Sequence, residues 1–290
     1  MTTIRTVVAA LDFSPASNAA VRRAARLAAE QGTALCLLHA FDASVWRDLK
    51  SDFDVQGTTG ELSPELRMQQ HLAEAAASLA AQTGLEVGIH FGSGPLATVL
   101  AAYVGSHAGS LVVIGSRAEP TLSGLGSTAL KVVRQPACPV LIVRAADDRP
   151  YDTVLSAVDL REGSIRAASL AVALFPDAHH HLLYALDALP AVSGAVGAEP
   201  LRLLHESLYA KAEHDLQDLA RQLSAVTRHP VAAVVADDVP ARAILVGAAN
   251  LAADCVVVGH HGQGTATDSH LGSMAQHVIY AALSDVLVGP

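Results

Sequence analysis

The segment that decides the fold reads Cys255-Val-Val-Val-Gly-His-His-Gly262, and nine residues later it continues with Gly272-Ser273. The apolar run at 255–258 predicts a strand covered on both faces, and a helix is expected to begin near Ser273. Glycines let the backbone approach an oxyanion, and a helix start offers unpaired N–H groups and the positive end of its dipole. The segment therefore predicts a strand–loop–helix unit that cradles phosphate.

An altered copy of this segment occurs in the first half of the chain. Leu111-Val-Val-Ile114 precedes Gly115-Ser-Arg-Ala118, and seven residues later comes Gly126-Ser127. Gly115 and Gly259 are 144 positions apart, whereas Ser127 and Ser273 are 146 apart, so the first loop is two residues shorter. Further landmarks recur at similar offsets: Val8–Asp12 with Leu155–Asp159, Leu37–Asp42 with Leu182–Asp187, and Pro139–Val143 with Asp285–Val288. The chain is therefore predicted to be a tandem repeat of units of about 145 residues.

Composition narrows the class of protein. A chain of 290 residues suits two domains, and 51% apolar residues with only 4% aromatic ones suit helices packed on a parallel sheet. The net charge of −9 argues against nucleic acid as a main partner. No apolar stretch reaches the roughly 20 residues that span a bilayer, and the N-terminus lacks a signal-peptide pattern. Three cysteines beside predicted strands suit reduced thiols. We expect a cytoplasmic protein without membrane contact.

Strands alternate with helices in both halves, which predicts parallel pairing with right-handed crossovers. The fold class is therefore α/β, with two tandem, doubly wound, five-stranded parallel sheets of the Rossmann-like kind. We expect one domain at 1–146, another at 151–290 and a short linker between them. The predicted strands are Thr6–Leu11, Ala34–His39, Glu86–His90, Leu111–Ile114 and Val140–Val143, then 153–158, 181–186, 231–235, 255–258 and 286–288.

The carboxyl ends of the strands are the expected ligand edge, because doubly wound sheets bind ligands there, at the switch in strand order. Asp159, Ala185 and Gly259 follow or end the first, second and fourth strands of the second half. These three positions are therefore expected to lie close together.

These residues resemble the universal stress protein family in its tandem form, over nearly the whole chain. The family's nucleotide signature is Gly-x2-Gly-x9-Gly-Ser/Thr after the fourth strand, with an Asp just after the first. The second half matches it with Gly259, Gly262, Gly272, Ser273 and Asp159. The resemblance implies a Rossmann-like fold of the adenine nucleotide alpha hydrolase type and the binding of ATP.

Carried onto this sequence, the resemblance implies a role for each matching position. Asp159 would face the adenosine, backbone at Ala185 would meet the adenine edge, and Val258 would pack against the nucleoside. The phosphates would be lined by Gly259, Gly262, Gly272, Ser273 and Met274. A divalent cation such as Mg²⁺ would be held beside them mainly by phosphate oxygens and water.

Two departures in the second half bear on this site. Arg161 stands two residues after Asp159, where the first half has the family's usual Ser14, and it would either neutralise phosphate or crowd the adenosine. Gln263 replaces a residue that is basic in many members.

The first half keeps Asp12 and Ser14 but has Ala118 in place of a glycine. Its shorter loop loses up to about 7 Å of reach, at roughly 3.5 Å per residue. We expect the site of the first half to be empty or to hold something smaller than a nucleoside triphosphate.

Two functions from different classes remain open. The first is a stress-response protein that binds ATP in its second domain and acts through homodimerisation or partner binding. In relatives, the last strand of the sheet pairs domains. The second is a carrier or scaffold for a metal or an apolar ligand, in which His260, His261, Asp268 and His270 gather zinc. No residue is assigned a catalytic role, and the sequence supports weak ATP hydrolysis at most.

Overall fold

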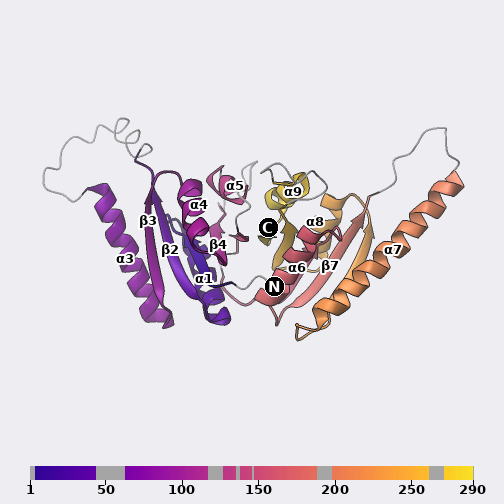
Figure 1. The fold of residues 1–290 in the computed structure, drawn as a ribbon, viewed down its shortest axis with the longest axis horizontal. Coiled ribbons are helices and arrows are strands. Elements are labelled where there is room, and N and C mark those ends of the chain that lie inside the picture. Colours follow the sequence, from indigo (N-terminus) through magenta and orange to yellow (C-terminus); the bar gives the residue numbers. More distant parts are fainter. Residues whose placement is uncertain are drawn as a thin grey trace. The chain divides into compact units, whose positions relative to one another are not determined.

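The computed structural model describes residues 4–43, 63–116, 127–134, 138–145, 147–187, 198–260 and 271–289. The chain divides into two compact units, Thr2–Asp148 and Arg149–Pro290. Figure 1 shows a sheet flanked by helices in each of them. The predicted α/β class with parallel sheets is confirmed.

The first unit contains a parallel sheet in the order β3-β2-β1-β4-β5. The order reverses between β1 and β4, and this is the switch point at which such sheets bind ligands. The elements, in chain order, are β1 (Thr6–Ala10), α1 (Pro15–Gln31), β2 (Ala34–Phe41), α3 (Pro64–Thr83), β3 (Val87–Ser93), α4 (Leu96–Ser106), β4 (Ser110–Gly115), α5 (Ser127–Val133) and β5 (Val140–Val143).

The second unit repeats this arrangement with the order β8-β7-β6-β9-β10, and its switch point lies between β6 and β9. Its elements, in chain order, are β6 (Thr153–Ala157), α6 (Glu162–Leu174), β7 (His179–Leu186), α7 (Ala198–Ser224), β8 (Ala232–Asp237), α8 (Pro240–Asn250), β9 (Cys255–Gly259), α9 (Ser273–Ala281) and β10 (Asp285–Gly289). Helix α7 packs against β8 and β7 at one side of this sheet (Figure 1).

Local sequence explains where the elements begin and how deeply they lie. The central strands are aliphatic and almost wholly buried, as expected for strands covered on both faces. Helix α1 begins at Pro15, because the side chain of Ser14 accepts a hydrogen bond from Ser17 N and Pro15 suits the first helical position. It ends at Gly32, whose φ of 61° is left-handed.

Strand β7 begins at His179, two residues before the predicted start. The backbone N–H of His179 donates to Asp152 O at 2.8 Å, and His179 pairs in register with Thr153. His180 is 1% exposed, and its Nε2 bonds Phe175 O at 2.8 Å. Burial lowers the pKa of His180. The sequence analysis placed the start of this strand at its apolar residues and so left out His179 and His180. The structure includes them because their backbone pairs with β6.

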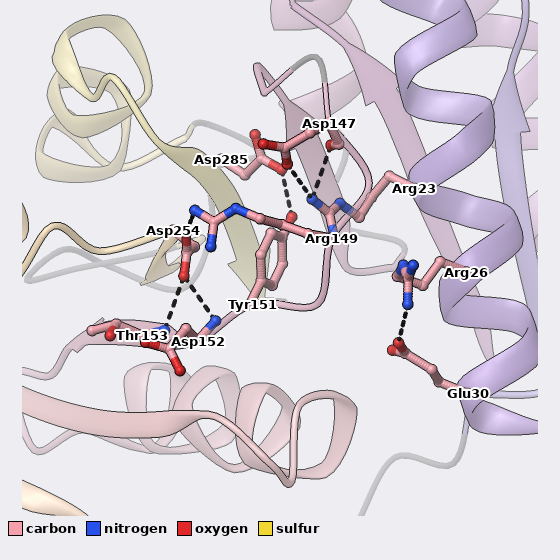
Figure 2. Close-up of polar contacts among 10 residues, drawn as sticks. All are labelled: Arg23, Arg26, Glu30, Asp147, Arg149, Tyr151, Asp152, Thr153, Asp254 and Asp285. Atoms are coloured by element: carbon pink, nitrogen blue, oxygen red, sulfur yellow. Dashed lines mark hydrogen bonds and ion pairs between the residues drawn. The ribbon is translucent and has the colours of Figure 1, made fainter.

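The chain on each side of the division between the units is held by its own unit (Figure 2). In the first unit, the buried guanidinium of Arg23 donates to Asp147 O at 3.2 Å. In the second, Asp254 accepts from Arg149 at 2.5 Å and from the backbone N–H groups of Asp152 and Thr153 at 2.8 and 3.0 Å. Asp254 therefore fixes the start of β6 beside the start of β9.

Among the residues that the structure describes, no helix is both long and apolar enough to cross a bilayer. The structure describes all three cysteines, Cys36, Cys138 and Cys255, and none of them forms a disulfide. Burial raises the pKa of Cys138 to about 11, so this thiol stays protonated at neutral pH.

Candidate functional site

The turn after β6 fixes the carboxylate of Asp159. Its Oδ1 accepts from Arg161 N at 3.1 Å and from Ser164 Oγ at 2.5 Å, and its own N–H donates to Ser164 Oγ at 3.1 Å. The turn places Leu160 at φ 60°, a left-handed conformation that costs a side-chain-bearing residue roughly 1–2 kcal/mol. Such strain persists only where the surroundings enforce it, and it clusters at ligand sites.

The first unit has the same turn after β1. Asp12 Oδ1 accepts from Ser14 N at 3.0 Å, Asp12 N donates to Ser17 Oγ at 3.2 Å, and Phe13 has φ 64°. Desolvation acts to raise the pKa of Asp12, but hydrogen bonds from Ser14 and Ser17 outweigh it and the net shift is downward. Both units therefore present an oriented carboxylate at the switch point.

Arg161 changes the start of α6 relative to α1. It occupies the N-cap position with φ −97° and ψ 160°, and its side chain is exposed and makes no capping hydrogen bond. At the corresponding position, Ser14 caps α1. Helix α6 therefore lacks the side-chain N-cap that α1 has.

Replacing Arg161 with serine is expected to raise the free energy of unfolding by about 1 kcal/mol, because the hydroxyl would accept an N–H of the first turn of α6. Urea denaturation of Arg161→Ser and of the parent measures this change. Arg161→Ala, which supplies no acceptor, is the control. Equal stability of the serine and alanine variants would show that α6 needs no cap.

Gly259, at the end of β9, is explained by packing. A Cβ at this position would lie 3.3 Å from Ser164 N and 3.4 Å from Gly163 C, so the missing side chain lets the first turn of α6 approach. Gly115 is tighter still, because its Cβ would meet backbone atoms of Ala16. The shared glycine therefore reflects the approach of a helix to the strand end, and Gly115 by itself does not indicate phosphate.

The start of α9 supplies what an anion requires. Gly272 is its N-cap, with φ −56° and no side-chain cap, Ser273 is exposed and Met274 is partly exposed. The first-turn N–H groups of such a helix attract negative charge. Gly272 N donates to His260 O at 2.9 Å, and His260 N donates to Gly289 O at 2.7 Å.

The backbone of His260 has a positioning role that the sequence analysis did not predict. His260 is 2% exposed, and its backbone joins the end of β10 to the start of α9. In the first unit, Ser116 N makes the corresponding bond to Val143 O at 2.8 Å. The zinc alternative assigns a role to the side chain of His260, whereas these hydrogen bonds involve its backbone, so that alternative stays a prediction.

The structure brings several of the predicted site residues to one edge. Asp159 follows β6, Gly259 ends the neighbouring β9, and Ala185 lies on β7, on the other side of β6. Val258 is only 3% exposed, so contact between its side chain and a nucleoside stays a prediction. Gly262 lies outside the described residues, as do His261, Asp268 and His270 of the zinc alternative. Within the described ranges, no three His, Cys, Asp or Glu residues could hold a metal ion.

Comparison with known proteins agrees with the repeat. The sequence model of the Universal stress protein family matches residues 3–144 and again 150–290. Universal stress protein Rv2623 of Mycobacterium tuberculosis is 29% identical over 97% of this chain and 95% of its own length. Rv2005c of the same organism is 33% identical, but the match covers 63% of this chain and 62% of that protein.

Solved structures agree on the fold. A putative universal stress protein from Pseudomonas aeruginosa UCBPP-PA14 aligns with a TM-score of 0.67 and 17% identity, over 99% of this chain and 93% of that one. A universal stress protein from Archaeoglobus fulgidus aligns with a TM-score of 0.64 and 19% identity, over 98% and 97%. At these identities the likeness supports the architecture alone.

Proposed function

Because the chain belongs to the universal stress protein family, with one match to the family in each unit, we propose that its second unit binds an adenine nucleotide, ATP, and that its first unit does not. The observation that carries this proposal is the pairing of two features at the β6–β9 switch point. These are the carboxylate of Asp159, fixed by Arg161 N and Ser164 Oγ, and the uncapped start of α9 at Gly272.

The two features suit opposite ends of a nucleotide. A carboxylate accepts hydrogen bonds from ribose hydroxyls, and Asp159 Oδ1 is already bonded, so its other oxygen is the one we assign to the sugar. The first turn of α9 offers N–H groups and a positive dipole end to the phosphates. The signature Gly259, Gly262, Gly272 and Ser273 then lies along the phosphates, with Met274 beside them and Ala185 at the adenine edge.

Charge requires a counterion for the phosphates. The chain carries a net charge of −9 and only 19 lysines and arginines. We propose that Mg²⁺ accompanies the nucleotide, held chiefly by phosphate oxygens and water. Arg161, exposed at the start of α6, is the cationic side chain of this turn that could add to that neutralisation.

We propose that the protein acts by binding rather than by turnover, with weak hydrolysis at most. The bound nucleotide would bias homodimerisation or the binding of a partner in a stress response. Three cysteines without a disulfide suit a reducing compartment, and we place the protein in the cytoplasm.

Identifying what the purified protein carries tests this proposal. The protein is denatured, the released small molecules are identified by mass spectrometry, and metals are counted in the same sample. We expect ATP or ADP at about one per chain, because only the second unit has a complete signature. Release of zinc or of an apolar compound without nucleotide would favour the carrier function.

A further inference from the structure

The first unit concentrates aromatic rings at the carboxyl ends of its strands. Its aromatic cluster consists of Phe13, His39, Phe41, His71 and Phe91. Phe13 contacts His39 and His71 at centroid distances of 5.6 and 6.1 Å. His39 contacts Phe91 at 5.6 Å, and Phe91 stacks with Phe41 at 6.3 Å. Three of the five phenylalanines in the chain belong to this cluster, so the gathering is not a general property of the composition.

Among the residues that the structure describes, the equivalent positions of the second unit form no such aromatic cluster. The strand registers place Ala10 beside Leu38 and Ala157 beside Leu183, so His39 and Phe41 correspond to Tyr184 and Leu186. Phe91 pairs with His39, just as Val235 pairs with Tyr184. Phe13 and Leu160 both follow the Asp of the turn. A sheet of this topology thus folds with Leu, Leu and Val at these positions, and the three phenylalanines are not needed for the fold.

These rings are neither core nor open surface. Leu37 and Leu38 on β2 are fully buried, whereas Phe13, Phe41 and Phe91 are all partly exposed and His71 is exposed. His39 is 8% exposed, and its Nδ1 lies 2.7 Å from Leu11 O, which fixes the ring. Partly exposed rings that pack on one another leave aromatic surface available to a further planar ring.

Two further observations place this surface at a ligand edge. Phe13 holds a left-handed φ of 64° between Asp12 and Ser14, a conformation that phenylalanine rarely adopts and that turns its ring toward His39 and His71. Asp12 precedes it with an oriented carboxylate, and hydrogen bonds lower the pKa of that carboxyl. The site therefore combines aromatic surface with an acceptor for an N–H or O–H donor.

We propose that the aromatic cluster of the first unit binds a planar, uncharged aromatic ligand that carries an N–H or O–H donor and no phosphate. The donor bonds to Asp12, and the ring packs against Phe13, Phe41 and Phe91. A phosphate is disfavoured because the loop that would cradle it after β4 is two residues shorter than that of the second unit and has Ala118 in place of a glycine. This site is separate from the nucleotide site and does not depend on it.

The probe for this site is N-phenyl-1-naphthylamine, an uncharged aromatic amine with one N–H donor that fluoresces more strongly in apolar surroundings. The test variant of the full chain is Phe41→Leu with Phe91→Val, which installs the residues of the second unit. Its affinity for the probe is expected to fall about tenfold, since each lost ring contact contributes part of that change. Phe13→Leu is expected to lower the affinity for the probe as well. Leucine is tolerated in this backbone conformation, because Leu160 has a φ of 60° at the equivalent position of the second unit.

The controls separate this site from other apolar surface and from the nucleotide site. Leu186→Ala with Val235→Ala, at the equivalent positions of the second unit, should leave the affinity for the probe unchanged, and excess ATP should not displace the probe. Thermal unfolding confirms that each variant is folded. The proposal is overturned if the unaltered protein does not bind the probe, if the phenylalanine swaps leave its affinity unchanged, or if ATP displaces it.

Discussion

Replacing Asp159 with alanine is expected to weaken ATP binding by about ten- to a hundredfold, the effect of losing a hydrogen bond to a charged group. The carboxylate is the proposed acceptor for the ribose, and it also accepts from Arg161 N and Ser164 Oγ. Stability should fall by about 1–3 kcal/mol, because these donors lose their partner. Calorimetric titration with ATP and urea denaturation measure the two effects on the same preparation.

Asp12→Ala is the matched control for this prediction. Asp12 accepts from Ser14 N in the same turn of the first unit, so its removal should also reduce stability. It should leave the affinity for ATP unchanged, because the first unit lacks a complete loop. If both substitutions weakened ATP binding equally, the nucleotide would not be confined to the second unit.

Replacing Tyr151 with phenylalanine is expected to lower the free energy of unfolding by about 2–3 kcal/mol. The hydroxyl of Tyr151 donates to Asp285 Oδ2 at 2.5 Å, as Figure 2 shows. Asp285 is fully buried and Tyr151 is 7% exposed, so water cannot readily replace the lost donor. Urea denaturation monitored by circular dichroism measures the loss.

Tyr209→Phe provides the comparison. The hydroxyl of Tyr209 donates to Val235 O at 3.2 Å in a partly buried place, and this neutral hydrogen bond should contribute only about 1 kcal/mol. A loss for Tyr151→Phe no greater than that for Tyr209→Phe would mean that Asp285 is adequately solvated or bonded without the tyrosine.

The fold was predictable because its signals are local and occur twice. Aliphatic runs such as Val140–Val143 mark buried strands, and Ser14-Pro15 marks a helix start, so the order of elements follows without tertiary information. The ends of strands were less predictable. Strand β7 starts at His179 because β6 offers a backbone partner, and an imidazole such as His180 can be buried when a carbonyl accepts its hydrogen bond.

The candidate site was predictable only in part. Asp159 and the glycines emerged from the repeat, but the left-handed φ of Leu160 and the backbone bonds of His260 depend on how the chain turns in space. The role of Gly259 in admitting α6 also needs the distance between strand and helix. The sequence analysis also missed Ser164, whose hydroxyl accepts a hydrogen bond from Asp159 N. The repeat contained a signal for it, because Ser17 and Ser164 each stand five positions after the Asp of their turn.

Binding of ATP by the second unit is tested most directly by a calorimetric titration of the full chain, freed of bound nucleotide, with ATP in the presence of Mg²⁺. We expect one binding site per chain, which Asp159→Ala weakens and Asp12→Ala does not affect. Two equivalent sites per chain, or no binding by a folded protein, would contradict it.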